Sequence, residues 1–288
     1  MPSLLSPSAH SSAHTPPTFP FVRSSFCRAF AALALSTGVA SAQYAGRLDT
    51  NLIVNASAEL GPISPDVSPV SSIPGWANQG NVTVVRYGAG GIFPSSSSPG
   101  PAQRGSAFFC GGPQSTTPAI TQVVDLSMFA RIIDQGQATL RVSAFLGGGG
   151  SDEDLAYYFV LFQRPQGDSA YVASLFGPNS TARANQTSLL PLSDTRLVPP
   201  NVRFATVVLQ FTLASGTYSN GYADDLTLTI SGPCESDFNF DGGIDGSDLD
   251  AFFIAWESGS QFADINNDGG VDGSDVQAFF DSWEAAAC

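Results

Sequence analysis

An acidic stretch of twelve residues occurs twice near the end of this chain. It reads DFNFDGGIDGSD from Asp237 to Asp248 and DINNDGGVDGSD from Asp264 to Asp275. Neither copy contains Lys or Arg, so no positive side chain within the copy offsets the mutual repulsion of the carboxylates. Because a compact fold brings these carboxylates together, the repeat predicts a bound cation in each copy.

The spacing of the oxygen-bearing residues is that of an EF-hand-type calcium loop. Ligands come from positions 1, 3, 5, 7, 9 and 12, and a glycine at position 6, here Gly242 or Gly269, makes the sharp turn. Position 12 is Asp rather than Glu. Such an all-oxygen set favours Ca²⁺ over Mg²⁺, which keeps several of its waters. We therefore expect two Ca²⁺ ions, with ligands from Asp237, Asn239, Asp241, Gly243, Asp245 and Asp248 and from Asp264, Asn266, Asp268, Gly270, Asp272 and Asp275.

Each loop is followed by apolar residues at the i, i+3, i+4, i+7 spacing of an amphipathic helix. The two sets are Leu249, Phe252, Phe253 and Trp256, and Val276, Phe279, Phe280 and Trp283. Only two residues separate Cys234 from the first loop, which leaves no room for the entering helix of an EF-hand. Residues 234–288 therefore resemble a type I dockerin, a family whose members dock onto cohesin domains. Because positions 10 and 11 are Gly and Ser in both loops, where this family selects its partner, another surface or scaffold protein stays open beside a cohesin-like one.

The beginning of the chain has the pattern of a secretory signal. Arg23 and Arg28 precede an apolar run over 29–40, and small residues at Ala40 and Ala42 mark a cleavage site before Gln43. We therefore expect residues 1–42 to be removed and the protein to be secreted or placed at the cell surface. No other segment approaches the roughly 20 apolar residues of a transmembrane helix.

Charge and cysteine usage fit an exported calcium protein. The segment 235–284 holds 13 of the 25 acidic residues and no basic residue, and no basic patch occurs elsewhere, which excludes nucleic acid as a partner. Cys234 and Cys288 bracket the repeats, and an oxidising compartment permits a disulfide between them. Cys110 is then left as an inert buried thiol or a reactive one.

Residues 43–232 have the pattern of a mainly β domain. Alternating apolar and polar residues separated by turn sequences indicate a jelly-roll-like β-sandwich, followed by the small α-helical module over 233–288. The expected strands are 52–55, 82–87, 106–110, 120–124, 138–146, 156–163, 170–176, 203–213 and 226–230, with a weak helical pattern at 127–133.

Three short sequences, NLIVNASAE, IPGW and YADDLTL, resemble parts of galactose-binding-like domains, which include many carbohydrate-binding modules. The resemblance implies one structural Ca²⁺ held by Glu59 and Asp225, with Asp224 as the substitute; charges that protect a strand edge are the alternative. It also implies a polysaccharide ligand stacked on aromatic rings. Trp76 is the first candidate for this platform, because it follows a Pro-Gly turn, and the others are Tyr87, Tyr157, Tyr158 and Tyr171. A place in the hydrophobic core is the alternative for each of these rings.

Enzymatic activity has little support in the sequence. Both histidines, His10 and His14, precede the cleavage site, which excludes histidine-based nucleophile pairs and the usual zinc sites from the mature chain. A glycoside hydrolase needs only two carboxylates, so it stays open. We expect a secreted, non-catalytic binding or structural protein attached to a surface or assembly through its calcium module. The alternatives are a glycoside hydrolase component of polysaccharide degradation and an envelope adhesin.

Overall fold

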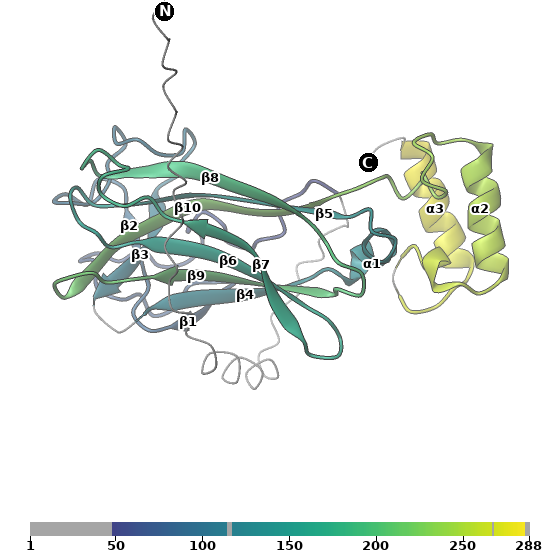
Figure 1. Ribbon diagram of the computed structural model, residues 1–288, viewed down its shortest axis with the longest axis horizontal. Helices are drawn as coiled ribbons and strands as arrows, with labels where there is room; N and C mark the ends of the chain where they lie inside the picture. The colour runs from purple at the N-terminus through teal and green to yellow at the C-terminus, as the bar shows by residue number, and fades with distance from the viewer. Residues whose placement is uncertain (1–47, 114–116, 267, 286–288) are drawn as a thin grey trace, which may run out of the picture. The chain divides into compact units, whose positions relative to one another are not determined.

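The computed structural model describes residues 48–113, 117–266 and 268–285. Within these ranges ten strands form two five-stranded antiparallel sheets, in the orders β1-β4-β9-β6-β7 and β2-β3-β10-β5-β8 (Figure 1). The first sheet contains β1 (Ala77–Gln79), β4 (Ala119–Asp125), β6 (Ala156–Gln163), β7 (Ser169–Phe176) and β9 (Phe204–Phe211). The second contains β2 (Thr83–Arg86), β3 (Ala107–Pro113), β5 (Thr139–Gly148), β8 (Ser188–Leu197) and β10 (Tyr218–Ser231). The predicted mainly β sandwich is confirmed; the expected signal segment lies outside the described residues.

Strand β6 shows why the sequence folds into a sandwich. Its residues alternate between buried and half-buried, and Tyr158 and Phe162 enter the core between the sheets while Tyr157 and Phe159 face outward. Successive side chains of a strand point to opposite faces, so an alternating sequence buries one face of the sheet. The hydrophobic core therefore lies between the two sheets.

The outer face of the second sheet is covered by neighbouring segments of the chain. Phe108 and Tyr222, in β3 and β10, are fully buried there in a smaller apolar cluster. Val67, from the segment before β1, and Phe93, from the segment between β2 and β3, pack against this cluster. No such cluster is found over the outer face of the first sheet among the described residues, and Phe176 and Val123 are 63% and 58% exposed there.

Several expected elements differ from the observed ones. Residues 52–55 form no strand: the segment ends in a turn at Asn55, whose φ is 53°. β1 and β8 were not expected, and β10 begins well before the expected 226–230. The weak helical pattern corresponds to the 3₁₀ turn η1 (Ser127–Phe129) and the helix α1 (Ala130–Asp134).

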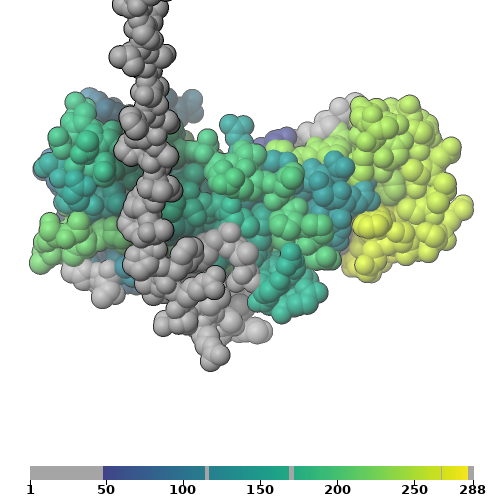
Figure 2. All heavy atoms as spheres, viewed as in Figure 1, coloured from purple at the N-terminus to yellow at the C-terminus, as the bar shows by residue number. Residues whose placement is uncertain are grey.

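The C-terminal segment contains α2 (Gly246–Glu257), the short η2 (Gln261–Ala263) and α3 (Gly273–Ala285) (Figure 1). The expected apolar stripes meet between the two helices. Phe252 and Phe279 are both fully buried and their rings stack at 4.2 Å with an interplanar angle of 3°. The atoms of α2 and α3 are closely packed in the space-filling view, where they are yellow-green and yellow (Figure 2). None of the helices in the described ranges is long and apolar enough to cross a membrane.

Candidate functional site

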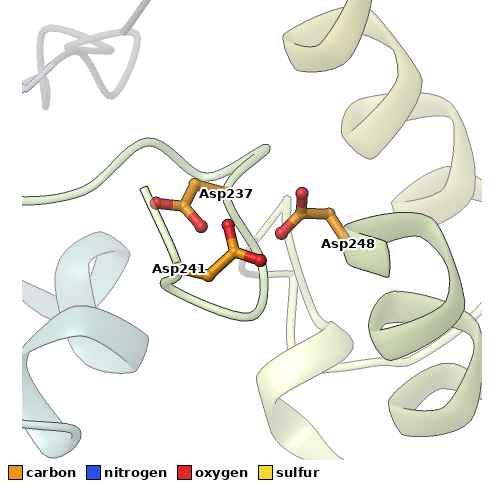
Figure 3. A group of neighbouring side chains, drawn as sticks. All are labelled: Asp237, Asp241 and Asp248. Atoms are coloured by element: carbon orange, nitrogen blue, oxygen red, sulfur yellow. The ribbon is translucent and has the colours of Figure 1, made fainter. Parts of the chain in front are cut away.

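The first acidic loop brings three of its expected ligands together. Asp237, Asp241 and Asp248 each offer a carboxylate oxygen, and these oxygens all lie within 4.8 Å of one another. Figure 3 shows the three side chains converging, two from the loop and Asp248 from the first turn of α2. Ligands on opposite sides of a Ca²⁺ ion are about 4.6–5.2 Å apart, because each bond is about 2.3–2.6 Å long. The separation therefore fits Ca²⁺.

Hydrogen bonds within the first loop leave one carboxylate oxygen free for a cation. Asp237 is 6% exposed, its Oδ2 accepts the Gly242 N–H at 3.1 Å, and its Oδ1 is buried without a partner. Asp248 accepts the N–H groups of Asn239 and Asp245 at 3.0 and 2.9 Å, which caps α2. A buried charged oxygen without a partner is costly, and a metal ion would satisfy it.

The second loop repeats this arrangement with one difference. The Gly269 N–H donates to Asp264 Oδ2 at 3.0 Å, and the Asn266 N–H donates to Asp275 at 3.2 Å. However, Asp264 Oδ1 accepts the Asp268 N–H at 3.1 Å, so it has a partner that Asp237 Oδ1 lacks. Among the described residues, three carboxylates come within 4.8 Å only in the first loop. The two loops therefore share their backbone design but not their present ligand geometry.

Two further expected ligands, Asp245 and Asp272, make hydrogen bonds within their own loops and are not part of the three-carboxylate cluster. Each accepts both the hydroxyl and the N–H of a serine two residues later. These hydrogen bonds lower the pKa of both carboxyls. Gly242 and Gly269 have φ values of 89° and 90°, which non-glycine residues rarely adopt. The glycine expected at position 6 is thus required by the turn. Gly243 and Gly270 follow it, where a backbone carbonyl ligand is expected.

Two cysteine expectations can be followed into the structure. Cys234 is disulfide-bonded. Cys288, its expected partner, lies outside the described residues. Cys110 is fully buried, and burial raises the pKa of its thiol to about 12. Because thiolate is the reactive form, this cysteine is the inert one of the two alternatives.

The structure shows where the three acidic residues named for a calcium site in the sandwich lie, and that site stays a prediction. Glu59 accepts the N–H groups of Ser106 and Ala107 at 2.7 and 2.9 Å. Asp225 is exposed, with a φ of 52°, whereas Asp224 is fully buried and accepts the Tyr87 hydroxyl at 2.6 Å. Burial, followed by the charges of Asp225 and Glu59, raises the pKa of Asp224 to about 7. Of the two neighbouring aspartates, Asp224, the substitute ligand, is therefore the buried one.

Trp76 does not form an exposed sugar platform. It is 8% exposed, its indole N–H donates to the Asn55 carbonyl at 3.2 Å, and its ring packs edge-on against Phe109 at 5.8 Å. This corrects the expectation, because the ring is a core residue whose faces are covered. Tyr158 is likewise buried, with its hydroxyl donating to the Thr227 carbonyl at 2.8 Å. The side chain of Tyr171 lies outside the described residues.

An aromatic surface lies instead on the outer face of the first sheet. Tyr157 and Phe159 stack at 5.7 Å with an interplanar angle of 15°, and Phe176 meets them edge-on at 5.6 and 6.0 Å. We call these three residues the aromatic row. The strand register places Gln210 beside Tyr157 and Ser174 beside Phe159. Amide and hydroxyl side chains thus lie beside the rings, and the outward residues of these pairs carry no formal charge.

Sequence reasoning named Tyr157 but missed the other two rings. The signal was present in the strand sequence AYYFVLFQ, where alternation puts Tyr157 and Phe159 on the face opposite to Tyr158. Phe176 could not be joined to them before the pairing of β6 with β7 was known.

Comparisons with known proteins give fold similarities only. No protein-family model matches the chain, and no curated protein matches it. A family 16 carbohydrate-binding module is 19% identical with a TM-score of 0.37, covering 62% of this chain and 99% of that one. The structure of a Clostridium thermocellum endo-1,4-beta-D-xylanase, with a family 22 module and complexed with xylohexaose, is 13% identical. Its TM-score is 0.36, and the match covers 58% of this chain and 28% of that one.

A third similar structure is the enzymatically active domain of a bacteriophage CBA120 tailspike protein. It is 15% identical with a TM-score of 0.34, and the match covers 62% of this chain. The chain spans only 24% of the tailspike structure's length. Carbohydrate-binding modules are therefore among the structures similar to the sandwich. Because all three TM-scores are low, a function for this chain has to come from its own residues.

Proposed function

We propose that residues 233–288 form a calcium-binding module that attaches an exported, non-catalytic sandwich to a surface or extracellular assembly. The observation that carries the proposal is the convergence of Asp237, Asp241 and Asp248 around a buried, unpartnered carboxylate oxygen. The paired helices and the dockerin resemblance support a protein partner, either cohesin-like or another scaffold protein. Two Ca²⁺ ions are expected, one in each loop.

Calcium titration of the full chain tests this proposal. Isothermal titration calorimetry should show two ions per chain, and thermal unfolding should shift upward with Ca²⁺. A ligand at a thousand times its dissociation constant adds about 4 kcal/mol to the free energy of unfolding. Asp237→Asn and Asp264→Asn should each remove or weaken one site, and Asp250→Asn, an acidic residue of α2 outside the expected ligand set, is the control. Undetectable calcium binding by the folded chain would refute the proposal.

We further propose that the sandwich binds a neutral polysaccharide on the aromatic row. Stacked rings suit the apolar faces of sugar rings, and the neighbouring Gln210 and Ser174 can hydrogen-bond hydroxyl groups. Phe176 is 63% exposed, although a large apolar side chain gains stability from burial. The uncharged surroundings favour a neutral ligand over a polyanion.

A glycan array of the full chain, followed by titration of each hit, tests the second proposal. Phe176→Ala and Tyr157→Ala should weaken binding about tenfold or more, because each removes one stacking ring. Val123→Ala is the matched control, since Val123 is also exposed on the outer face of the first sheet but lies on β4. Equal losses in all three variants, or no hit among neutral glycans, would contradict carbohydrate binding at this row.

A further inference from the structure

The two calcium loops are close copies in sequence, yet among the described contacts an arginine from the sandwich donates hydrogen bonds to the first loop alone. Arg131 lies on α1, and its guanidinium donates to the carbonyl oxygens of Glu235 and Phe238 at 3.0 and 3.2 Å. The guanidinium carbon also lies 4.5 Å and 4.6 Å from the ring centroids of Phe238 and Phe240. The described part of the chain from residue 48 onward belongs to one compact unit, so these contacts lie within it.

The two rings that lie against the Arg131 guanidinium belong to different cores. Phe238 packs with Phe252 and Phe279 in the core of the helical module, whereas Phe240 packs against the core of the sandwich. Arg131 therefore contacts the first loop at one residue from the core of the helical module and at one residue that packs against the core of the sandwich. In the second loop the corresponding residues are Ile265 and Asn267, and neither has an aromatic ring for a guanidinium. The first loop thus has an anchor that the sequence of the second loop cannot provide.

Such an anchor changes the free energy of calcium binding. A loop that is mobile without calcium loses conformational entropy when it closes on the ion, and a loop already held in place loses less. The hydrogen bonds of Arg131 go to backbone carbonyls, so they leave the carboxylates available for the ion. The positive charge of Arg131 acts in the opposite direction, because it repels a nearby cation.

We propose that the first loop is the tighter of the two calcium sites and that Arg131 is the positioning residue that makes it so. This rests on the proposed calcium function of the module. The two ions then load in order, first the loop that Arg131 holds and then the second loop. The attached module is consequently fixed to the sandwich at calcium concentrations that leave its second loop empty.

Single-site variants of the full chain test this order. Asp268→Ala leaves the first loop as the calcium site, and Asp241→Ala leaves the second, since both residues occupy position 5 of their loops. We expect the dissociation constant of the first loop to be about tenfold lower by calorimetry. Arg131→Met should remove that advantage in the Asp268→Ala background and leave the Asp241→Ala background unchanged. Arg131→Lys, which keeps the charge but loses the planar donors, should also weaken the first site.

Hydrogen exchange without calcium gives a second measurement that does not depend on the ion. The N–H groups of Gly242 and Gly269 donate to equivalent aspartates at 3.1 and 3.0 Å, so they form a matched pair. With chelator present, Gly242 should exchange more slowly than Gly269, and Arg131→Met should remove the difference. If Arg131→Met fails to fold, Phe240→Leu, which removes one stacked ring, should give the same change in weaker form.

The outcomes separate this inference from the proposed function. A folded chain that binds no calcium would refute the module's function itself. Two sites of equal affinity, or equal exchange of Gly242 and Gly269, would overturn the inference while leaving calcium binding intact. If the first site binds calcium more tightly in Arg131→Met than in the chain with Arg131, the inference would also be overturned, because the charge repulsion from Arg131 would then outweigh its positioning effect.

Discussion

The buried carboxyl of Asp224 should make the stability of the sandwich fall as the pH rises. Burial raises its pKa from an ordinary value of 3.8 to about 7, despite the hydrogen bond from Tyr87. The folded state therefore keeps a proton that the unfolded state loses near pH 4. The free energy of unfolding therefore has its highest contribution from Asp224 below pH 4, and this contribution is lost as the pH rises from 4 to 7. A difference of about 3 pKa units corresponds to about 4 kcal/mol of unfolding free energy.

Asp224→Asn measures this loss directly, because the variant cannot ionise. In chelator, urea unfolding at pH 4 and pH 8 should show the variant gaining about 4 kcal/mol over the wild type between the two values. A constant effect of the altered hydrogen bonds cancels in that difference. Asp134→Asn is the control: burial raises the pKa of Asp134, but hydrogen bonds from Arg203 and Asn201 outweigh burial and lower it. Because the pKa of Asp134 is lowered, the difference in unfolding free energy between Asp134→Asn and the wild type should vary with pH only in acid. A pH-independent difference for Asp224→Asn would refute the reasoning.

Three further substitutions of buried side chains, one with an exposed control, test the stability of the fold. Trp76→Ala should lower the free energy of unfolding by about 3–5 kcal/mol in urea, since the ring is buried; a loss below 1 kcal/mol would contradict its core position. Phe279→Ala should cost the helical module a similar amount in thermal unfolding followed by circular dichroism, whereas Ile254→Ala, at a side chain that is 71% exposed, should cost little. Arg183→Met should destabilise the sandwich in urea, because the buried guanidinium donates to backbone carbonyls such as that of the half-buried Gly150; unchanged stability would contradict this.

The strands that sequence could predict are those in which one face is buried. β6 was found with its observed bounds because its residues alternate strictly. β8 was missed, since its sequence SLLPLSDTRL contains Pro191 and the exposed charged side chain of Arg196. Such residues read as a loop, but they are tolerated at the edge of a sheet, and β8 is an edge strand paired only with β5. Edge position is a property of the assembled sheet, which no local pattern contains.

The candidate sites divide in the same way. The convergence of Asp237, Asp241 and Asp248 could be predicted because the three residues lie within twelve positions of one another, so spacing alone brings them together. The aromatic row could not, since it joins β6 to β7 and depends on register. Trp76 was misplaced because a Pro-Gly turn indicated exposure, whereas the indole turns inward to donate to the Asn55 carbonyl. The difference between the two loops could not be predicted from sequence either, because Arg131, which contacts the first loop, lies more than a hundred residues before it.

The two proposed activities use opposite chemistry, and this makes them separable in one protein. The module contributes carboxylates and binds through charge, whereas the aromatic row contributes neutral rings and binds through apolar contact. The row contains no carboxylate, and the calcium loops supply none of its rings. A chelator should therefore abolish attachment through the module while leaving glycan affinity unchanged. Among the described contacts of the first loop, Arg131 is the basic side chain that joins the loop to the sandwich, and it lies outside the aromatic row.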